Sequence, residues 1–196
     1  MHLNQYLYNK ILTKNPDLLT EFELIKGCVG QNATSQRLLF EQYSGKFMTV
    51  CLRYANDGME AEDMLQDGFI RIFNNIHQFK FEGSFEGWMR RIVVNVALKY
   101  LQKKKMHFSD ITDNSAQAPS LDAYAFAHLG QDEILKLINQ LPEGYKIVFN
   151  LNVIEGYSHE EIGDLLKIQA STSRSQLVKA RKMLQQQILD LQKIAV

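Results

Sequence analysis

The strongest constraint on the fold is a nearly continuous series of apolar repeats at helical spacing, interrupted by very few helix breakers. Only three of the 196 residues are proline: Pro16, Pro119 and Pro142. Proline is tolerated in the first turn of a helix or in a linker, but it breaks a helix interior. Each of the three falls where a helix would start or a linker would run. The sequence therefore predicts an all-α protein.

Composition narrows the size of the core and the class of function. A hydrophobic content of 45% over 196 residues suffices for one ordinary core or two small ones. No segment approaches the ~18 apolar residues of a membrane span, and residues 1–10 lack the layout of a secretory signal, which predicts a cytoplasmic protein. Cys28 and Cys51 have neither CxxC spacing nor a neighbouring histidine. We therefore expect two buried thiols and no metal or other cofactor.

Residues 88–105, WMRRIVVNVALKYLQKKK, carry six lysines or arginines and no acidic residue, in a chain with a formal net charge of zero. Helical spacing predicts two faces for this segment. The face toward the core would consist of Trp88, Ile92, Val96 and Tyr100. The outward ridge would consist of Arg91, Asn95, Leu98 and Gln102. A solvated basic helix end, favoured by the helix dipole, is the simpler interpretation.

The segment that leads into this helix favours nucleic-acid binding instead. Residues 77–88, HQFKFEGSFEGW, here called the aromatic loop, contain four aromatic residues separated by glycines, with Lys80 among them. Unstacked bases bind aromatic faces, and every nucleotide adds a phosphate that attracts cations. The aromatic loop and the basic helix together predict a surface for single-stranded nucleic acid.

A different surface is predicted on the helix over residues 60–76, which follows a turn at Asp57-Gly58 with the glycine at positive φ. Its apolar stripe faces inward, and the opposite side, here called the acidic ridge, consists of Asp63, Gln66, Asp67, Ile70 and Asn74. A solvated acidic face is one interpretation. An acidic ridge with an apolar centre at Ile70 also suits a basic protein partner.

Residues 106–128 are rich in Ser, Asp, Ala and Asn, which predicts a flexible linker between two small helical domains. Further along the chain, Ser158-His159-Glu160-Glu161 forms a capping box that opens a short helix through Leu166. A tight turn at residues 167–169 leads into a helix that ends near Leu191. Two helices joined by so short a turn have the layout of a helix-turn-helix.

The second helix of this motif has two distinct faces. Its core face is predicted to consist of Ser173, Leu177, Ala180, Leu184 and Ile188. The outward side would present Ser171, Thr172, Ser175, Val178, Lys179 and Lys182, flanked by Arg174 and Arg181. Hydroxyl and guanidinium groups can reach base edges in the major groove, and lysines can hold phosphates. The alternative is a solvated amphipathic helix.

These segments resemble a known family. AEDMLQDGFIRIFNNIHQF followed by FEGSFEGWMRRIVVNVALKYLQKKK is similar to region 2 of bacterial sigma factors of the extracytoplasmic-function (ECF) type, within the sigma-70 family. LPEGYKIVFNLNVIEGYSHEEIGDLL followed by STSRSQLVKARKMLQ resembles their region 4. The resemblance implies an N-terminal extension (1–20), a region 2 domain (21–105), a linker (106–128) and a region 4 domain (129–196).

The resemblance also implies a function and partners. The chain would be a non-enzymatic factor that binds core RNA polymerase and directs it to promoter DNA, with a membrane-bound anti-sigma factor as a further partner suggested by the family. The residues that dock on the coiled coil of the largest polymerase subunit would be Asp63, Gln66, Asp67 and Ile70. The minus-ten element, opened to single strands with a base flipped out, would be bound by Lys80, Phe81, Phe85, Arg91 and Asn95. The minus-thirty-five element, read as duplex, would be bound by Ser171, Thr172, Arg174, Ser175, Val178, Lys179 and Lys182.

Two positions depart from the family pattern. Family members usually have glycine where this chain has Lys167, so a left-handed backbone there would cost up to ~1 kcal/mol relative to glycine. They also usually have serine or a similar cap where Gln169 stands. This predicts that the recognition helix starts later, with Ser171 as its N-cap.

Two other classes of protein compete with this interpretation. A stand-alone helix-turn-helix regulator that binds duplex DNA without polymerase would need only residues 141–191, and it has no use for the acidic ridge or the aromatic loop. An enzyme would need a catalytic constellation. The sequence has no Ser-His-Asp grouping, metal-spaced His or Cys set, or phosphate-binding glycine loop.

Overall fold

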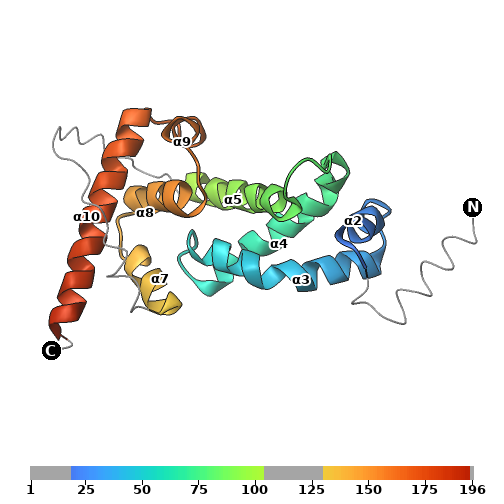
Figure 1. Ribbon diagram of the computed structural model, residues 1–196, viewed down its shortest axis with the longest axis horizontal. Helices are drawn as coiled ribbons and strands as arrows, with labels where there is room; N and C mark the ends of the chain where they lie inside the picture. The colour runs from blue at the N-terminus through green and yellow to red at the C-terminus, as the bar shows by residue number, and fades with distance from the viewer. Residues whose placement is uncertain (1–18, 104–129, 195–196) are drawn as a thin grey trace, which may run out of the picture. The chain divides into compact units, whose positions relative to one another are not determined.

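The computed structural model describes residues 19–103 and 130–194, and the chain divides into two compact units at the boundary between Gln102 and Lys103. The described residues form helices and no strand (Figure 1), which confirms the predicted all-α fold. The predicted linker over residues 106–128 lies outside the described residues. So does the predicted N-terminal extension, except for its last two residues.

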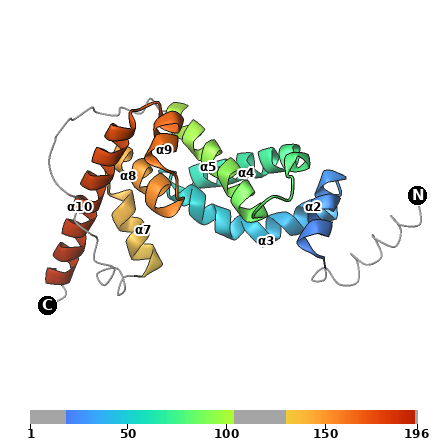
Figure 2. The same ribbon diagram turned by 45° about the horizontal axis from the view of Figure 1, so that its top comes forward.

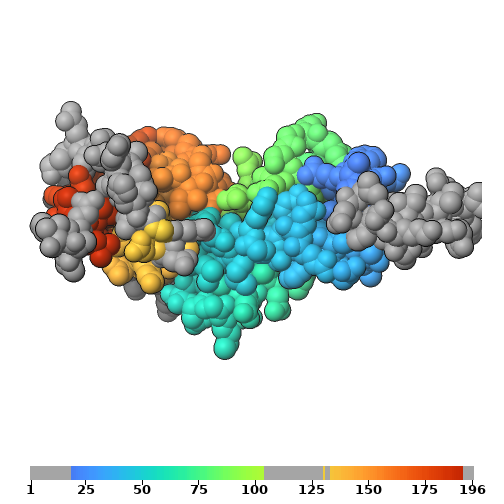
Figure 3. Space-filling model, turned by 60° about the horizontal axis from the view of Figure 1, so that its bottom comes forward, coloured from blue at the N-terminus to red at the C-terminus, as the bar shows by residue number. Residues whose placement is uncertain are grey.

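Within residues 19–103, the structure describes four α-helices and one short 3-10 helix. They are α2 (Glu21–Val29), α3 (Ala33–Leu52), α4 (Gly58–Asn75), η2 (Ile76–Gln78) and α5 (Phe85–Lys103). α3 and α4 pack side by side in both ribbon views (Figures 1 and 2), and their outer surfaces adjoin on the face shown in Figure 3. The core between the helices is fully buried and includes Leu39, Phe47, Met64, Ile72 and Met89.

A glycine in α4 permits the close approach of α5. A Cβ atom at Gly68 would lie 3.2 Å from Cγ2 of Val93, which is tighter than ordinary van der Waals contact. α4 itself begins differently from the prediction. Asp57 is its N-cap, with Oδ1 accepting a hydrogen bond from the Glu60 amide at 2.8 Å, and Gly58 is the first helical residue, without positive φ. The predicted turn with a left-handed glycine was wrong because the aspartate caps the helix directly.

The second unit contains α7 (Gln131–Asn139), α8 (Glu143–Phe149), the π-helical turn η3 (Asn150–Ile154), α9 (His159–Leu166) and α10 (Ala170–Ile194). α10 packs against α8 and α9. The predicted capping box is present: the Ser158 hydroxyl accepts from the Glu161 amide, and the Glu161 carboxylate accepts from the Ser158 amide. The predicted core face of α10 is also confirmed, because Ser173, Leu177, Ala180, Leu184 and Ile188 are all buried.

The turn between α9 and α10 requires a glycine before it. Gly163 accepts backbone hydrogen bonds from Lys167 and Ile168, and a Cβ atom there would lie 2.9 Å from the Ile168 carbonyl oxygen.

We expect Gly163→Ala to destabilise the second unit by about 1–3 kcal/mol, because backbone atoms must shift to accept the methyl group. Amide hydrogen exchange in α9 and α10 measures this. The control is Gly45→Ala in α3 of the first unit, measured by hydrogen exchange in α3, since its added Cβ would meet nothing within 4 Å. A loss of protection no greater than the control's would contradict the close-packing argument.

Lys167 ends α9 in the left-handed conformation, at φ 60° and ψ 42°. This is the left-handed conformation in which lysine was predicted to be less stable than the glycine usual in the family. We expect Lys167→Gly to increase the free energy of unfolding of the second unit by up to about 1 kcal/mol. The control is Lys182→Gly, at an exposed position inside α10, which should instead destabilise by about 1 kcal/mol. The same sign for both substitutions would show that the left-handed backbone is not the cause.

Candidate protein-binding and nucleic-acid-binding surfaces

The acidic ridge lies on the solvent side of α4, as predicted. Asp63, Gln66 and Asn74 are exposed and Asp67 is half-buried, while Ile70 at the centre of the ridge keeps 56% of its surface exposed. Exposure of the apolar isoleucine side chain to water is unfavourable, and its burial against a partner would be favourable. The ridge therefore combines negative charge with an apolar group that can be buried by a partner.

A tyrosine from α5 fixes one carboxylate of this ridge. The Tyr100 hydroxyl donates to Oδ2 of Asp67 at 2.9 Å. Partial burial, together with this bond and the charge of Asp67, raises the pKa of Tyr100 to about 12, so the phenol stays protonated and can donate at neutral pH. The sequence interpretation placed Tyr100 in the core stripe and missed this contact, because spacing along α5 carries no information about which residue of α4 lies opposite.

The aromatic loop splits into a buried part and an exposed part. Phe79 and Phe85 are buried, with exposed fractions of 8% and 1%, and their ring centroids lie 5.0 Å apart. Phe81 is 51% exposed and Lys80 is exposed. Phe85 was predicted to bind the minus-ten element, but its ring packs against Tyr43, Phe79 and Trp88 and has no open face for a base. Phe85 is a core residue that supports the loop, and we correct that assignment.

Phe81 has an unusual backbone conformation, with φ at 59°. Positive φ in a bulky residue is a strained conformation that the surrounding structure must impose. The Phe81 ring lies 5.1 Å from the ring of Phe79 and 5.2 Å from that of Phe22 on α2, and Phe22 is itself 56% exposed. The result is an aromatic pair on the surface, formed by residues far apart in the sequence. Sequence analysis missed Phe22, since nothing in its local pattern points to the loop.

The buried residues of α5 extend around more of the helix than the stripe that the sequence predicted. Val96 is buried, but Trp88, Ile92 and Tyr100 are only partly buried. The buried set is Phe85, Met89, Val93, Val94, Val96, Ala97, Leu98 and Leu101. Leu98, predicted on the outward ridge, is 3% exposed, so this prediction was wrong. Arg91, Asn95 and Gln102 are exposed as predicted, and the outward ridge is therefore a purely polar one.

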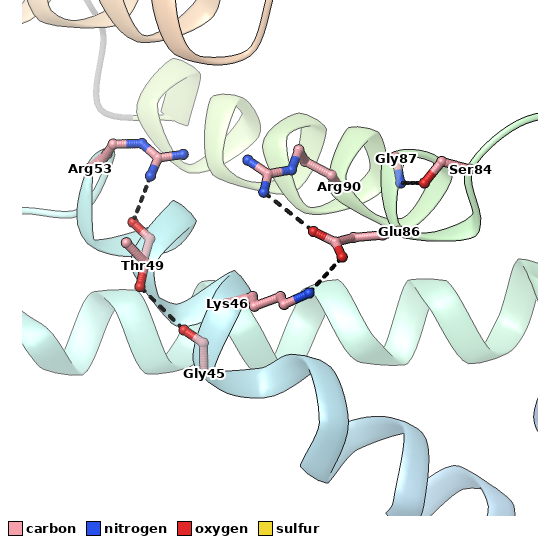
Figure 4. A network of polar contacts seen from close by, with 8 residues as sticks. All are labelled: Gly45, Lys46, Thr49, Arg53, Ser84, Glu86, Gly87 and Arg90. Atoms are coloured by element: carbon pink, nitrogen blue, oxygen red, sulfur yellow. Dashed lines mark hydrogen bonds and ion pairs between the residues drawn. The ribbon is translucent and has the colours of Figure 1, made fainter. Parts of the chain in front are cut away.

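The start of α5 is tied to α3 by a charged network (Figure 4). Ser84 caps the helix by accepting from the Gly87 amide at 3.2 Å. Glu86 then bonds Lys46 of α3 at 2.7 Å and lies 3.6 Å from Arg90 one turn later. The Lys46 hydrogen bond is the main cause that lowers the pKa of Glu86. The carboxylate therefore stays ionised and holds the beginning of the basic helix against α3.

In the second unit, α10 presents the predicted outward residues. Ser171, Arg174 and Lys182 are exposed, and Thr172, Ser175, Val178 and Lys179 are partly exposed. The helix starts at Ala170, directly after Gln169, and the Ser173 amide donates to the Gln169 carbonyl. The prediction of a later start capped by Ser171 was wrong. Ser171 lies in the first turn, where its hydroxyl donates to the Gln169 side chain at 3.2 Å.

Two consecutive side-chain contacts join α9 to α10 beside this surface. Nδ1 of His159 lies 2.8 Å from Oγ of the buried Ser173. The next residue of each helix forms an ion pair, with Nη2 of Arg174 2.6 Å from Oε1 of Glu160. Burial, and next the charge of Arg174, lowers the pKa of His159, so the imidazole is neutral at pH 7 and its Nδ1 can accept a hydrogen bond from the Ser173 hydroxyl.

The lowered pKa of His159 predicts how stability changes with pH. The unfolded chain, with an ordinary histidine pKa near ~6.5, binds more protons than the folded chain as the pH falls through that value. The stability that comes from the neutral His159 is thus fully present above about pH 6.5, and it is lost as the pH falls from there toward the lower pKa of the folded state. Hydrogen exchange in α9 and α10 from pH 7.5 to 5.5 should show this loss, and His159→Gln should reduce it. If His159→Gln shows the same loss of protection with falling pH as the wild type, His159 is not the cause of the pH dependence.

Within the described residues, the cysteines are buried and there is neither a metal-binding cluster nor a membrane-spanning helix. Cys28 and Cys51 are buried, as predicted, and burial raises their thiol pKa values to about 11 and about 12. In residues 19–103 and 130–194, no three His, Cys, Asp or Glu side chains gather in a way that could hold a metal ion. No helix within those ranges is both long and apolar enough to cross a membrane.

Comparison with known proteins assigns the two units to one family. The family model for sigma-70 region 2 matches residues 39–106, and that for sigma-70 region 4 matches residues 131–184. Together they match more than half of the chain. The chain is 29% identical over 161 residues to the ECF RNA polymerase sigma factor SigW of Bacillus subtilis, covering 76% of this chain and 86% of the relative. It is 27% identical over 185 residues to the ECF RNA polymerase sigma-E factor of Haemophilus influenzae, covering 88% and 97%.

A solved structure that matches this chain is the sigma factor RpoE of Bartonella quintana in complex with the anti-sigma factor NepR. It has a TM-score of 0.48 and 18% identity, and the match covers 79% of this chain and 96% of that one. Both sigma-70 regions occur in order in one chain, and the sequence relatives are of the ECF type. This chain therefore belongs to the sigma-70 family of RNA polymerase sigma factors, as a member of the ECF type.

Proposed function

We propose that this sigma factor binds core RNA polymerase through the acidic ridge of α4, opens the minus-ten element with α5 and the aromatic loop, and reads the minus-thirty-five element with α10. The observation that carries the proposal is the presence, in one unit, of an acidic ridge with the exposed Ile70 and of a separate cationic and aromatic surface. A regulator that binds only duplex DNA would need neither. The family membership supports the same function.

The residues proposed for each step are those that the family resemblance implies, apart from the buried Phe85. Polymerase binding is assigned to Asp63, Gln66, Asp67 and Ile70. Binding of the opened minus-ten strand is assigned to Lys80, Phe81, Arg91 and Asn95, without the buried Phe85. Binding of the duplex is assigned to the outward residues of α10: Ser171, Thr172, Arg174, Ser175, Val178, Lys179 and Lys182. Since the factor hydrolyses no nucleotide in this proposal, the binding energy of unstacked bases drives strand opening.

Run-off transcription tests the proposal. The purified full chain is added to core RNA polymerase on a pool of genomic fragments, and the 5′ ends of the transcripts are mapped. We expect start sites that appear only when both proteins are present and that share upstream sequence elements. A protein that retards duplex fragments but confers no start sites on core polymerase would instead be a stand-alone regulator.

A membrane-bound anti-sigma factor and a cytoplasmic location complete the proposal. Both rest on the resemblance to the ECF type. Co-purification of the tagged chain from separated membrane and soluble fractions of its native host tests both. Retention of the chain in the membrane fraction by a single integral membrane protein would support the anti-sigma partner.

A further inference from the structure

We propose that Glu160 is a positioning residue, which orients Arg174 for base recognition and so sets the sequence preference of the recognition helix α10. The inference rests on the proposed function of α10. Arg174 is among the residues that the sequence pattern assigns to duplex DNA, whereas Glu160 entered the sequence analysis only as part of a capping box. The structure adds the contact between the two.

The ion pair is short and its two sides come from different helices. Oε1 of Glu160, in the first turn of α9, lies 2.6 Å from Nη2 of Arg174, in the first turns of α10. The side chains of Arg174 and Glu160 are 55% and 67% exposed. An ion pair as exposed as this contributes little to folding stability. A structural role is therefore a weak reason for its presence.

The backbone around the pair is fixed by neighbouring contacts. The capping box of Ser158 holds the start of α9, and the bond between His159 and the buried Ser173 joins the residues that directly precede Glu160 and Arg174. The carboxylate is thus presented to the guanidinium from a constrained position. Preorganisation of this kind lowers the side-chain entropy that a flexible arginine loses when it binds.

The pair leaves Arg174 able to bind a base. A guanidinium has five N–H donors in a planar fork, and the contact with Glu160 is made at Nη2. Recognition of guanine through O6 and N7 needs two donors. Arg174 can therefore keep its bond to Glu160 while it binds a guanine, with the carboxylate limiting the directions in which the fork points.

The negative charge of Glu160 should also weaken binding to unrelated DNA, because a carboxylate beside the recognition helix repels phosphates. Removing the charge is expected to change two quantities in opposite directions. Affinity for unrelated duplex should increase, while discrimination at the base pair read by Arg174 should decrease. A residue that only stabilised the fold would lower both affinities together.

The test begins with a duplex selected from a randomised pool by the wild-type full chain. Equilibrium binding is measured for that duplex, for its single base-pair variants and for an unrelated duplex, at one fixed salt concentration. Arg174→Ala first identifies the base pair at which discrimination depends on Arg174. We expect Glu160→Gln to reduce discrimination at that base pair by about fivefold or more, to bind unrelated duplex more tightly, and to leave the other base pairs unaffected. Glu160→Asp should retain part of the preference.

Asp164→Asn is the matched control. Asp164 lies one turn further along the same exposed face of α9, and Asp164→Asn removes a single negative charge, as Glu160→Gln does. It leaves intact the ion pair that Arg174 forms with Glu160 within the described residues. It should change affinity for unrelated duplex only. If Glu160→Gln discriminates as well as the wild type at the base pair identified by Arg174→Ala, the inference is overturned. If Arg174→Ala alters discrimination at no base pair, the proposed role of Arg174 itself is wrong.

Discussion

Replacing Asp63 and Asp67 together with lysine is expected to abolish co-purification of the chain with core RNA polymerase. The substitutions reverse two charges on the acidic ridge, both on the N-terminal side of the exposed Ile70. A basic partner surface that attracts the ridge would then face like charges, and such juxtapositions cost several kcal/mol across an interface. This corresponds to affinity that is weaker on the order of a hundredfold or more. Pull-down of core polymerase by the tagged full chain measures the effect.

The fold should survive this double substitution. Asp63 is exposed, and Asp67 is half-buried and accepts a hydrogen bond from the hydroxyl of Tyr100. Tyr100 is itself only partly buried, so its hydroxyl can donate to water when the aspartate is replaced. Circular dichroism and the thermal unfolding midpoint check this. Glu41→Lys with Glu82→Lys is the control, because it makes the same change in charge at exposed positions of the first unit outside the ridge. Undiminished polymerase binding by the ridge variant would refute the assignment of this surface.

Replacing Phe81 with alanine is expected to impair strand opening at the minus-ten element while leaving polymerase binding unchanged. The ring is held half-exposed by a strained backbone and by contacts with Phe22 and Phe79, so part of its surface remains for an unstacked base. Loss of base–aromatic stacking costs about 1–3 kcal/mol, which corresponds to a decrease in opened complexes of roughly 5- to 150-fold. Permanganate reactivity of unpaired thymines in the promoter measures the opened fraction.

Two comparisons separate stacking from other effects of this substitution. Phe81→Tyr keeps an aromatic face and should open the promoter nearly as well as the wild type. A template that is already mismatched across the minus-ten element should reduce the defect of Phe81→Ala, because unpairing no longer has to be driven by binding. A defect that is equal for alanine and tyrosine would point to the backbone conformation at residue 81 rather than to its ring.

Much of this protein is determined by its sequence alone. The scarcity of proline and the 3.6-residue spacing predicted an all-α fold, and the same spacing placed the acidic ridge and the core face of α10 correctly. The capping box at Ser158 was also predictable, because it depends on residues three positions apart in one segment. Local periodicity suffices for such features, since it relates side chains of one helix to each other.

Only the tertiary structure decided which residues meet across helices and how much of each helix is covered. Leu98 is buried although its spacing along α5 places it on the outward ridge, because burial depends on which other parts of the protein cover that side, and spacing along α5 cannot show this. Phe81 and Phe85 look equivalent in the sequence, but one ring fills the core and the other stays on the surface. The pairing of Phe81 with Phe22, of Asp67 with Tyr100 and of Glu160 with Arg174 joins residues from separate helices. Such contacts depend on the packing of whole helices, which a linear pattern does not encode.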